Sequence, residues 1–283
     1  MLDRHVIERA VQAALDEDAP WGDLSAELIP AEARAVAELR AREAGVMSGS
    51  AVFAAAFQLV DATCAVTVQV ADGESFTAGA LLATVSGPAR AVLRAERIGL
   101  NFIQRMAGIA TLTRAYVDAI AGTSARIVDT RKTTPGLRAF ERQAVRDGGG
   151  HNHRMTLSDA VMVKDNHLAV LTAAGNDLAS ALRSARAQIP HTAGFEVEVD
   201  RIDQLPAVLD ADVPIIMLDN FSLDDLSAGV ALIAGRAIVE ASGGVTLDSV
   251  AAIARTGVDV ISVGALTHST RALDLGLDIA VRE

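Results

Sequence analysis

The chain has 283 residues, a formal net charge of −11 and 51% hydrophobic residues, with only 3% aromatic residues. This length allows a barrel domain and a smaller second domain, and the acidic total argues against a general nucleic-acid or anionic-membrane surface. The longest uncharged stretch, residues 44–60, contains serines, glycines and a glutamine and is too short for a membrane span. The N-terminus mixes both charge signs, unlike a signal peptide, and Cys64 is the single cysteine. We therefore expect a cytoplasmic protein without disulfides.

The first third of the chain combines helical and strand patterns. Apolar residues at helical spacing predict an amphipathic helix over residues 3–17. From residue 35 to residue 85, alternating and β-branched segments separated by glycines predict a small sheet. A long helix is expected from residue 89 to about residue 106, and Gly108 separates it from a second helix over 111–121. These helices should connect to the second domain.

From residue 125 onward a strand-then-helix unit recurs six times, which predicts a parallel sheet covered by helices. The expected strands are 125–129, 160–164, 195–199, 214–218, 237–241 and 259–263. The expected helices are 137–147, 171–188, 201–209, 222–234 and 247–256.

Polar residues lie at or just beyond the C-terminal ends of these strands. They are Arg131 and Lys132, Lys164, Glu198, Asp219, Ser242 with Gly243, and Gly264. In a barrel such ends converge on the face that carries the active site, whereas a doubly wound sheet would spread them along a crevice. The pattern favours the barrel.

The charge of the chain is unevenly distributed. Residues 126–164 contain eight Lys and Arg against four Asp and Glu, so this segment is +4 while the remainder is −15. The chain has 23 Arg and two Lys, and both lysines, Lys132 and Lys164, lie in this segment. A retained lysine marks a place suited to a compact point charge. A cationic segment on an acidic protein points to a pocket for a small anion.

Two short segments concentrate this chemistry. Residues 129–138 place two adjacent cations at a strand end, and a fork-shaped Arg131 beside Lys132 suits a carboxylate next to a phosphate. Taken alone, such a pair would more often be a solvated surface pair. Residues 148–154 add three glycines, two histidines and an arginine, and successive glycines permit close backbone approaches. Each histidine alone would more often be a surface or packed residue.

Seven segments in order along the chain resemble the quinolinate phosphoribosyltransferase family, also called carboxylating nicotinate-nucleotide pyrophosphorylase. They are 129–136 (Asp-Thr-Arg-Lys-Thr-Thr-Pro-Gly), 148–154 (Gly-Gly-Gly-His-Asn-His-Arg), 164–167 (Lys-Asp-Asn-His), 196–200 (Glu-Val-Glu-Val-Asp), 218–220 (Leu-Asp-Asn), 242–244 (Ser-Gly-Gly) and 264–268 (Gly-Ala-Leu-Thr-His). Each segment alone is weak evidence for the family, but the ordered set is specific to it. The resemblance runs from about Asp16 to Asp278.

The resemblance implies an α/β fold with an irregular parallel α/β barrel over residues 108–267 and a smaller N-terminal α+β open-sandwich domain over residues 1–107. The C-terminal tail, 268–283, is expected to pack back on the N-terminal domain. The implied activity transfers the phosphoribosyl group of phosphoribosyl pyrophosphate to quinolinate with decarboxylation, giving nicotinate mononucleotide, pyrophosphate and CO2 in NAD biosynthesis. The resemblance further implies Mg²⁺ as cofactor and a homodimer with shared active sites.

The resemblance also assigns the site residues. Those implied for quinolinate are Arg131, His153, Arg154 and Lys164, with Arg97 contributed by the partner subunit. Lys132 is placed near the pyrophosphate-bearing substrate, and Glu198 and Asp219 face the ribose hydroxyls and magnesium, directly or through water. The 5-phosphate site is implied at Ser242, Gly243, Gly244, Gly264 and His268.

The chemistry of these residues suits the assignment, although single residues admit other interpretations. Carboxylate oxygens are suitable magnesium ligands. Without the resemblance, Arg97 would be an ordinary exposed helix charge, and Glu198 or Asp219 could each cap a following helix. Leaving-group departure and attack by the pyridine nitrogen need electrostatic stabilisation and positioning rather than a protein nucleophile.

Three other functions remain open from the sequence. A paralogue on the same fold, such as the related protein encoded with molybdate transporters, would act on another anion, but the segments 151–154 and 164–167 favour quinolinate. A metal-dependent barrel hydrolase would use His151 and His153 as ligands and a modified Lys164, but His151 follows a helix and a glycine run rather than a strand. A nucleic-acid binder is disfavoured by the acidic total and the scarcity of aromatics.

Overall fold

The computed structural model describes residues 2–173, 175 and 177–282 and divides into two compact units. Unit 1 consists of Met1–Arg114, Thr133–Gly149 and Ser269–Glu283, and unit 2 of Ala115–Lys132 and Gly150–His268. Residues 133–149, which the sequence placed within the barrel range, thus group with unit 1. No helix of the described chain is both long and apolar enough to cross a membrane.

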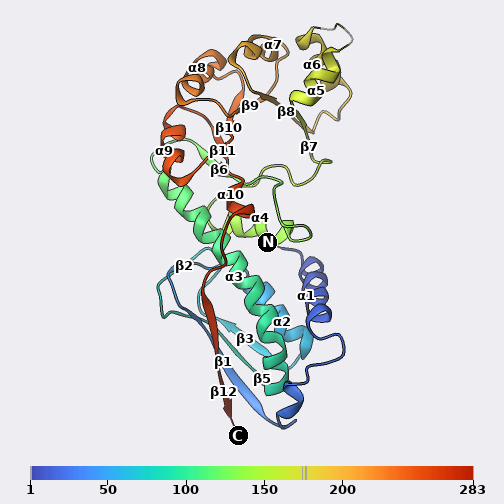
Figure 1. Ribbon diagram of the computed structural model, residues 1–283, viewed down its shortest axis with the longest axis vertical. Helices are drawn as coiled ribbons and strands as arrows, with labels where there is room; N and C mark the ends of the chain where they lie inside the picture. Colours follow the sequence, from blue (N-terminus) through green and yellow to red (C-terminus); the bar gives the residue numbers. More distant parts are fainter. Residues whose placement is uncertain (1, 174, 176, 283) are drawn as a thin grey trace. The chain divides into compact units, whose positions relative to one another are not determined.

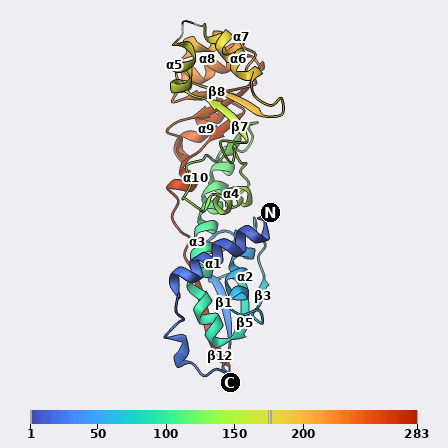
Figure 2. The same cartoon turned by 90° about the vertical axis from the view of Figure 1, so that its right-hand side faces the viewer.

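Unit 1 contains an antiparallel sheet built from both ends of the sequence. Its strand order is β12 (Leu275–Arg282), β1 (Arg34–Ala41), β5 (Leu81–Pro88) and β3 (Ala65–Val68), and β2 (Gly45–Val46) pairs separately with β4 (Ser75–Phe76). The helices α1 (Arg4–Asp18), α2 (Ser50–Val60) and the first part of α3 (Ala89–Ala119) lie on one face of this sheet (Figures 1 and 2). One short 3₁₀ helix, η1, spans Ala26–Leu28. The C-terminal strand is therefore an integral part of the N-terminal sheet.

Two helices of unit 1 differ from the sequence prediction. Helix α2 was not predicted, because residues 35–85 were all assigned to strands and turns; it buries Val52, Phe53, Ala56 and Phe57, which have helical spacing. Helix α3 is one continuous helix of 31 residues, so the predicted break at Gly108 was wrong. A Cβ atom at Gly108 would lie 2.2 Å from the carbonyl oxygen of Arg271. That glycine admits a close approach of the C-terminal segment rather than ending a helix.

Helix α4 (Arg138–Asp147) explains why residues 133–149 belong to unit 1. The ring of Phe140 lies 5.5 Å from that of Phe102 on α3. The buried carboxylate of Glu141 accepts hydrogen bonds from Arg105 Nη2 at 2.8 Å and from Thr134 Oγ1 at 2.8 Å. These contacts attach α4 and the turn before it to α3.

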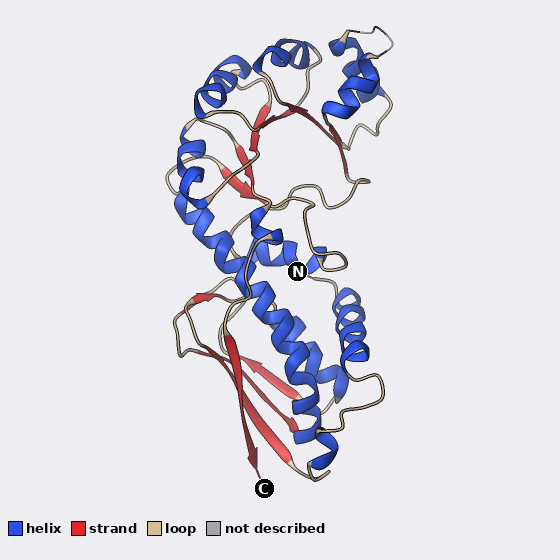
Figure 3. Ribbon diagram, in the orientation of Figure 1, coloured by secondary structure: helices blue, strands red, loops and turns tan. Residues whose placement is uncertain are grey.

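Unit 2 is a curved, six-stranded parallel sheet with helices on its outer side (Figures 1 and 3). The strand order is β6 (Arg126–Val128), β11 (Val260–Ser262), β10 (Ile238–Ser242), β9 (Ile215–Asp219), β8 (Gly194–Val199) and β7 (Ala160–Val163). The helical elements are α5 (Asp165–Thr172), α6 (Leu178–Ala187), η2 (Ile202–Gln204), α7 (Leu205–Asp210), α8 (Leu223–Ile233), α9 (Leu247–Arg255) and α10 (Ala265–His268). The expected α/β class, with a parallel sheet and a smaller antiparallel domain, is confirmed.

The single helix predicted over 171–188 was wrong. Its residues 174 and 176 lie outside the described part of the chain, and two helices, α5 and α6, flank them. The side chain of Asp177 accepts a hydrogen bond of 2.9 Å from the backbone N–H of Ser180. Asp177 is therefore the N-cap of α6, which begins as a separate helix. Helix α5 begins directly after Lys164 and was not expected there.

Candidate active site

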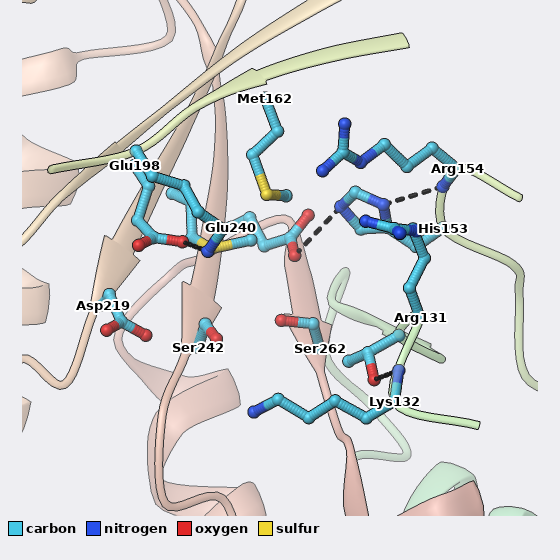
Figure 4. A pocket seen from close by; sticks show the side chains of 13 residues that line it. Arg131, Lys132, His153, Arg154, Met162, Glu198, Asp219, Glu240, Ser242 and Ser262 are labelled. Carbon is cyan, nitrogen blue, oxygen red and sulfur yellow. Dashed lines mark hydrogen bonds and ion pairs between the residues drawn. The ribbon is translucent and has the colours of Figure 1, made fainter. Parts of the chain in front are cut away.

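A cavity of about 400 Å³ opens among the strands of unit 2, and most residues predicted for the site line it. These are Arg131, Lys132, His153, Arg154, Lys164, Glu198, Asp219 and Ser242 (Figure 4). The side chains of Thr130, Met162, Met217, Glu240 and Ser262 complete the lining and were not predicted from the sequence.

Strand alternation explains which side chains reach the cavity. Successive residues of a strand point to opposite faces, so on β8 the buried Phe195, Val197 and Val199 share one face. Glu196 and Glu198 occupy the other. The same alternation places Met217 and Asp219 of β9, and Glu240 and Ser242 of β10, on the equivalent face, because Met217 pairs with Glu240 and Asp219 with Ser242. One face of the sheet packs on helices and the other carries the polar site.

Asp129, directly after β6, holds the segment 151–154 beside Arg131 and Lys132. Its carboxylate is fully buried and accepts hydrogen bonds from Asn152 Nδ2 at 2.6 Å and from the backbone N–H of His153 at 2.8 Å. The backbone N–H of His151 donates to the carbonyl of Ile127 at 2.8 Å, which forms an isolated parallel bridge at the edge of β6. Two distant cationic segments are thereby joined at one wall of the cavity.

That wall carries two guanidinium groups. Burial lowers the pKa of Arg154, and the positive charge of Arg131 lowers it further. The Nη1 atom of Arg154 donates to the carbonyl oxygen of Ala160 at 3.0 Å, which orients the group. Two cations that disfavour each other electrostatically in a partly buried pocket gain from a shared anion.

The opposite side of the cavity carries both signs of charge. Lys164 Nζ forms an ion pair with Glu198 Oε2, and the side chain of Glu198 is only 13% exposed. The backbone N–H of Lys164 donates to His167 Nδ1 at 3.0 Å at the start of α5. The carboxylate of Asp219 accepts a hydrogen bond of 2.6 Å from Asn220 Nδ2. Glu198 and Asp219 thus present carboxylate oxygens from adjacent strands.

The residues predicted for a phosphate are grouped around strand ends. Gly243 has φ of +95°, and a Cβ atom there would lie 2.2 Å from Asn220 Oδ1, so the turn after β10 requires glycine. A Cβ atom at Gly264 would lie 3.0 Å from His268 Nε2 and 3.3 Å from Lys132 Cδ, so these three residues are neighbours. Ser242 lines the cavity itself, whereas Gly243, Gly244, Gly264 and His268 are not among its lining residues.

Two buried glutamates, Glu196 and Glu240, were not assigned to the site from the sequence, although Glu196 begins the segment 196–200. The Nε2 atom of His153 lies 3.1 Å from Glu196 Oε2 and 3.5 Å from Glu240 Oε1. Both acids lie within strands. The sequence analysis selected polar residues at strand ends, so it did not select these two. The two-residue alternation of side chains along a strand could have identified them, because Glu196 shares a face with the predicted Glu198 and Glu240 with the predicted Ser242.

Two other residues considered in the sequence analysis, His151 and Arg97, do not line this cavity. His151 is exposed and does not line the cavity with His153, which disagrees with the ligand pair that a metal hydrolase would need. Arg97 is an exposed residue of α3 in unit 1 and is not among the residues that line the cavity in unit 2.

The fold and the site together define an α/β-barrel enzyme with a cationic pocket at the C-terminal ends of its parallel strands. Residues 109–278 match the family model described as the quinolinate phosphoribosyl transferase C-terminal domain, and residues 23–107 match that of the N-terminal domain. The chain belongs to the quinolinate phosphoribosyltransferase family.

Relatives and solved structures agree with this membership. The chain is 42% identical over 279 residues to the nicotinate-nucleotide pyrophosphorylase (carboxylating) of Mycobacterium leprae, covering 95% of each chain. It is 41% identical over 293 residues to quinolinate phosphoribosyltransferase (decarboxylating) 1 of Nicotiana glauca, covering 96% of this chain and 82% of the relative. The crystal structure of NadC from Streptococcus pyogenes matches with a TM-score of 0.94 at 40% identity, covering 100% of this chain and 99% of that chain.

Proposed function

We propose that this chain transfers the phosphoribosyl group of phosphoribosyl pyrophosphate to quinolinate and releases nicotinate mononucleotide, pyrophosphate and CO2, a step of NAD biosynthesis. The names of the relatives support this reaction, and one structural observation carries it for this chain. The same cavity is lined by four cations, those of Arg131, Lys132, Arg154 and Lys164, and by three carboxylates, those of Glu198, Asp219 and Glu240. Such a site suits the dianion quinolinate next to phosphoribosyl pyrophosphate, a polyanion that binds a metal ion.

Quinolinate has two adjacent carboxylates on a pyridine ring and needs two cationic clamps. The guanidinium groups of Arg131 and Arg154 offer planar, bidentate donors for one carboxylate. Lys164 offers a point charge for the other, and would exchange its partner Glu198 for the substrate. His153 lines the same pocket, and its Nδ1 accepts a hydrogen bond of 2.7 Å from the backbone N–H of Arg154.

The second substrate carries a pyrophosphate, a ribose and a 5-phosphate. We assign Lys132 to the pyrophosphate, and Glu198 and Asp219 to the ribose hydroxyls and Mg²⁺. Carboxylate oxygens on neighbouring strands fit a metal that retains waters and substrate oxygens around it. When bound, the metal would neutralise charge on the leaving pyrophosphate. The loops at Ser242, Gly243, Gly244, Gly264 and His268 are assigned to the 5-phosphate, for which backbone N–H groups are suitable donors.

The reaction follows from positioning and electrostatics. As the bond between C1′ and pyrophosphate breaks, positive charge develops on the ribose, and the pyridine nitrogen attacks C1′. The alkylated ring then accepts the electron pair of the breaking bond between C2 and its carboxylate. CO2 departs, and a proton takes its place on C2. In this reaction the chain's residues bind and orient both substrates.

We further propose a homodimer in which Arg97 of each subunit completes the quinolinate pocket of the other. Arg97 is an exposed residue of α3 in unit 1, so its guanidinium is accessible to a second subunit. A two-fold interface would allow each subunit to lend this arginine to its partner. A cytoplasmic location remains a prediction from the sequence.

The direct test is incubation of the purified protein with quinolinate, phosphoribosyl pyrophosphate and Mg²⁺, followed by mass detection of nicotinate mononucleotide. We expect one CO2 and one pyrophosphate per nucleotide formed. Nicotinate in place of quinolinate is the matched control, since it lacks the second carboxylate and should react poorly. Equal turnover of both acids, or no nucleotide, would contradict the proposal.

A further inference from the structure

The chain passes from unit 2 to unit 1 directly after two residues assigned to phosphoribosyl pyrophosphate. One passage follows Lys132 and another follows His268. Two residues further along, Thr134 and Thr270 already belong to unit 1. Two residues of extended chain reach at most about 7 Å. Contacts that hold Thr134 and Thr270 therefore also restrict where the backbone of Lys132 and that of His268 can lie.

One ion pair of unit 1 contacts both of these threonines. Glu141 of α4 has a side chain that is 1% exposed, and its Oε1 atom accepts hydrogen bonds from Arg105 Nη2 at 2.8 Å and Nε at 3.2 Å. The same carboxylate accepts from Thr134 through the hydroxyl at 2.8 Å and through the backbone N–H at 3.1 Å. The Nη1 atom of Arg105 donates to the carbonyl oxygen of Thr270 at 2.7 Å. The pair thus joins, within unit 1, two segments that are far apart in the sequence.

This ion pair has a rigid base. Arg105 lies on α3 and Glu141 on α4, and the rings of Phe102 and Phe140 on the same two helices lie 5.5 Å apart. A guanidinium group is planar, so its donors to Glu141 and its donor to Thr270 have fixed directions relative to each other. A buried carboxylate strongly favours the arrangement that keeps its donors. The contacts therefore fix the two segments relative to each other.

We propose that Arg105 and Glu141 are positioning residues for the phosphoribosyl pyrophosphate half of the site. Their ion pair fixes the backbone that follows Lys132 and the backbone that follows His268, and so sets the spacing between the cation assigned to the pyrophosphate and the loop assigned to the 5-phosphate. Arg105 and Glu141 lie outside the lining of the cavity and act through these two segments. The inference rests on the proposed assignment of Lys132 and His268 to phosphoribosyl pyrophosphate.

The consequence is a selective effect on one of the two substrates. Arg105→Met keeps the length of the side chain and removes its donors. Thr134→Val keeps the shape and removes the hydroxyl donor, but it leaves the ion pair in place and should fold normally. We expect kcat/KM for phosphoribosyl pyrophosphate to fall about tenfold in Arg105→Met and about threefold in Thr134→Val. The Kd for quinolinate alone, from calorimetric titration, should change by less than about twofold.

Two variants control for a general loss of stability in unit 1. Gln104→Met removes a neighbouring side chain of α3, whose Nε2 atom donates to the carbonyl oxygen of Leu275 at 2.7 Å. Ser48→Ala removes a hydrogen bond of 2.7 Å from Ser48 Oγ to Asp147, the last residue of α4. Both should leave kcat/KM for phosphoribosyl pyrophosphate within about twofold of the wild type. A fall in Gln104→Met as large as that in Arg105→Met would overturn the inference.

A double-mutant cycle tests whether Arg105 acts through the site residues. In the Lys132→Ala background, and likewise in the His268→Ala background, part of what Arg105 positions is already missing. Arg105→Met should then lower kcat/KM by about threefold or less in at least one of the two backgrounds. A purely structural loss would add its full effect in both. Full additivity in both backgrounds would therefore overturn the inference.

Hydrogen exchange followed by mass spectrometry tests the positioning without any turnover. In Arg105→Met, peptides covering residues 130–134 and 266–270 should exchange faster than in the wild type, whereas in Gln104→Met they should exchange at the wild-type rate. Unchanged exchange of both segments in Arg105→Met would overturn the inference. A wild-type protein that forms no nicotinate mononucleotide would instead refute the proposed function, and the exchange rates would still decide whether the ion pair holds the two segments.

Discussion

The hydroxyl of Thr267 donates a hydrogen bond of 2.7 Å to the backbone carbonyl oxygen of Lys132. Thr267 is fully buried on the short helix α10, and Lys132 follows β6, so 135 positions of sequence separate the two residues. Through this bond, the loop that follows the last strand of the barrel determines where the backbone of Lys132 lies. Gly264, directly before α10, lies against the side chains of Lys132 and His268.

Replacing Thr267 by valine keeps the shape and removes this donor. We expect a loss of about 1 kcal/mol in the free energy of unfolding and a several-fold rise in KM for phosphoribosyl pyrophosphate, with a smaller change for quinolinate. Thr256→Val is the matched control, because Thr256 Oγ1 also donates to a backbone carbonyl, that of Ile253, at 2.7 Å. Equal kinetic effects in the two variants would refute the positioning role of Thr267.

Lys164→Ala should abolish quinolinate binding while the fold is retained. A bound dicarboxylate loses a partly desolvated cation, which typically costs about 2–5 kcal/mol, and Glu198 loses its ion-pair partner. Calorimetric titration with quinolinate measures the effect. Arg201→Ala removes an exposed cation from unit 2 and should bind normally. Wild-type affinity of Lys164→Ala would show that quinolinate binds elsewhere.

Glu198→Gln and Asp219→Asn should each lower turnover with Mg²⁺ and phosphoribosyl pyrophosphate strongly. The same substitutions should lower thermal stability less. Their carboxylates line the cavity, where a change of charge alters substrate and metal binding. Asp177→Ala is the contrasting control, because Asp177 caps α6 and its loss should cost about 1 kcal/mol of stability with activity retained. Parallel melting curves and activity assays compare the three variants. Reduced stability with normal turnover in the two site variants would assign them a structural role.

Arg97→Ala and Lys164→Ala should each be nearly inactive as pure homodimers, yet regain activity when mixed. In a mixed dimer one pocket receives both lesions and the other receives neither, if each chain lends its Arg97 across an isologous interface. Random mixing in equal amounts makes half of the dimers mixed, so roughly one quarter of all pockets should be intact. The two variants are refolded together or co-expressed, and their specific activity is compared with that of each alone.

The control for this experiment is demonstrated subunit exchange, for example by mass detection of mixed dimers. If Arg97 acted within its own chain, every pocket would carry one lesion. Exchange without any gain in activity would therefore exclude a shared active site, and a monomeric protein in solution would exclude it as well.

Glu43 should make the stability of unit 1 depend on acidic pH. Hydrogen bonds from the Arg271 side chain, followed by the backbone N–H of Asp274, lower the pKa of Glu43 to about 2. A carboxyl group whose pKa is lower in the folded state contributes stability that is present above its unfolded pKa of about 4.5 and is lost as the pH falls through about 2. Glu43→Gln should flatten this part of the stability curve. Identical curves between pH 5 and pH 2 would show that the contact does not fix the C-terminal segment.

The sequence by itself determined the repeated strand–helix units, the α/β class and the residues at the strand ends. These features depend on local periodicity and on side-chain chemistry, and both can be recognised without knowing what packs against them. The predicted strand at 195–199 is β8, and Glu198 reaches the cavity as expected because strand alternation is a local rule.

Other features depend on partners distant in sequence, and only the tertiary structure decided them. Helix α3 continues through Gly108, and the Arg271 backbone approaches so closely there that only glycine fits. Residues 133–149 join unit 1 through the contacts of Glu141 with Arg105. The buried pair Glu196 and Glu240 has the same sequence context as any strand residue. Its contacts with His153 form only in the fold, which brings residues of β8 and β10 to the same side chain, and the free energy of a buried charge depends on the groups that surround it.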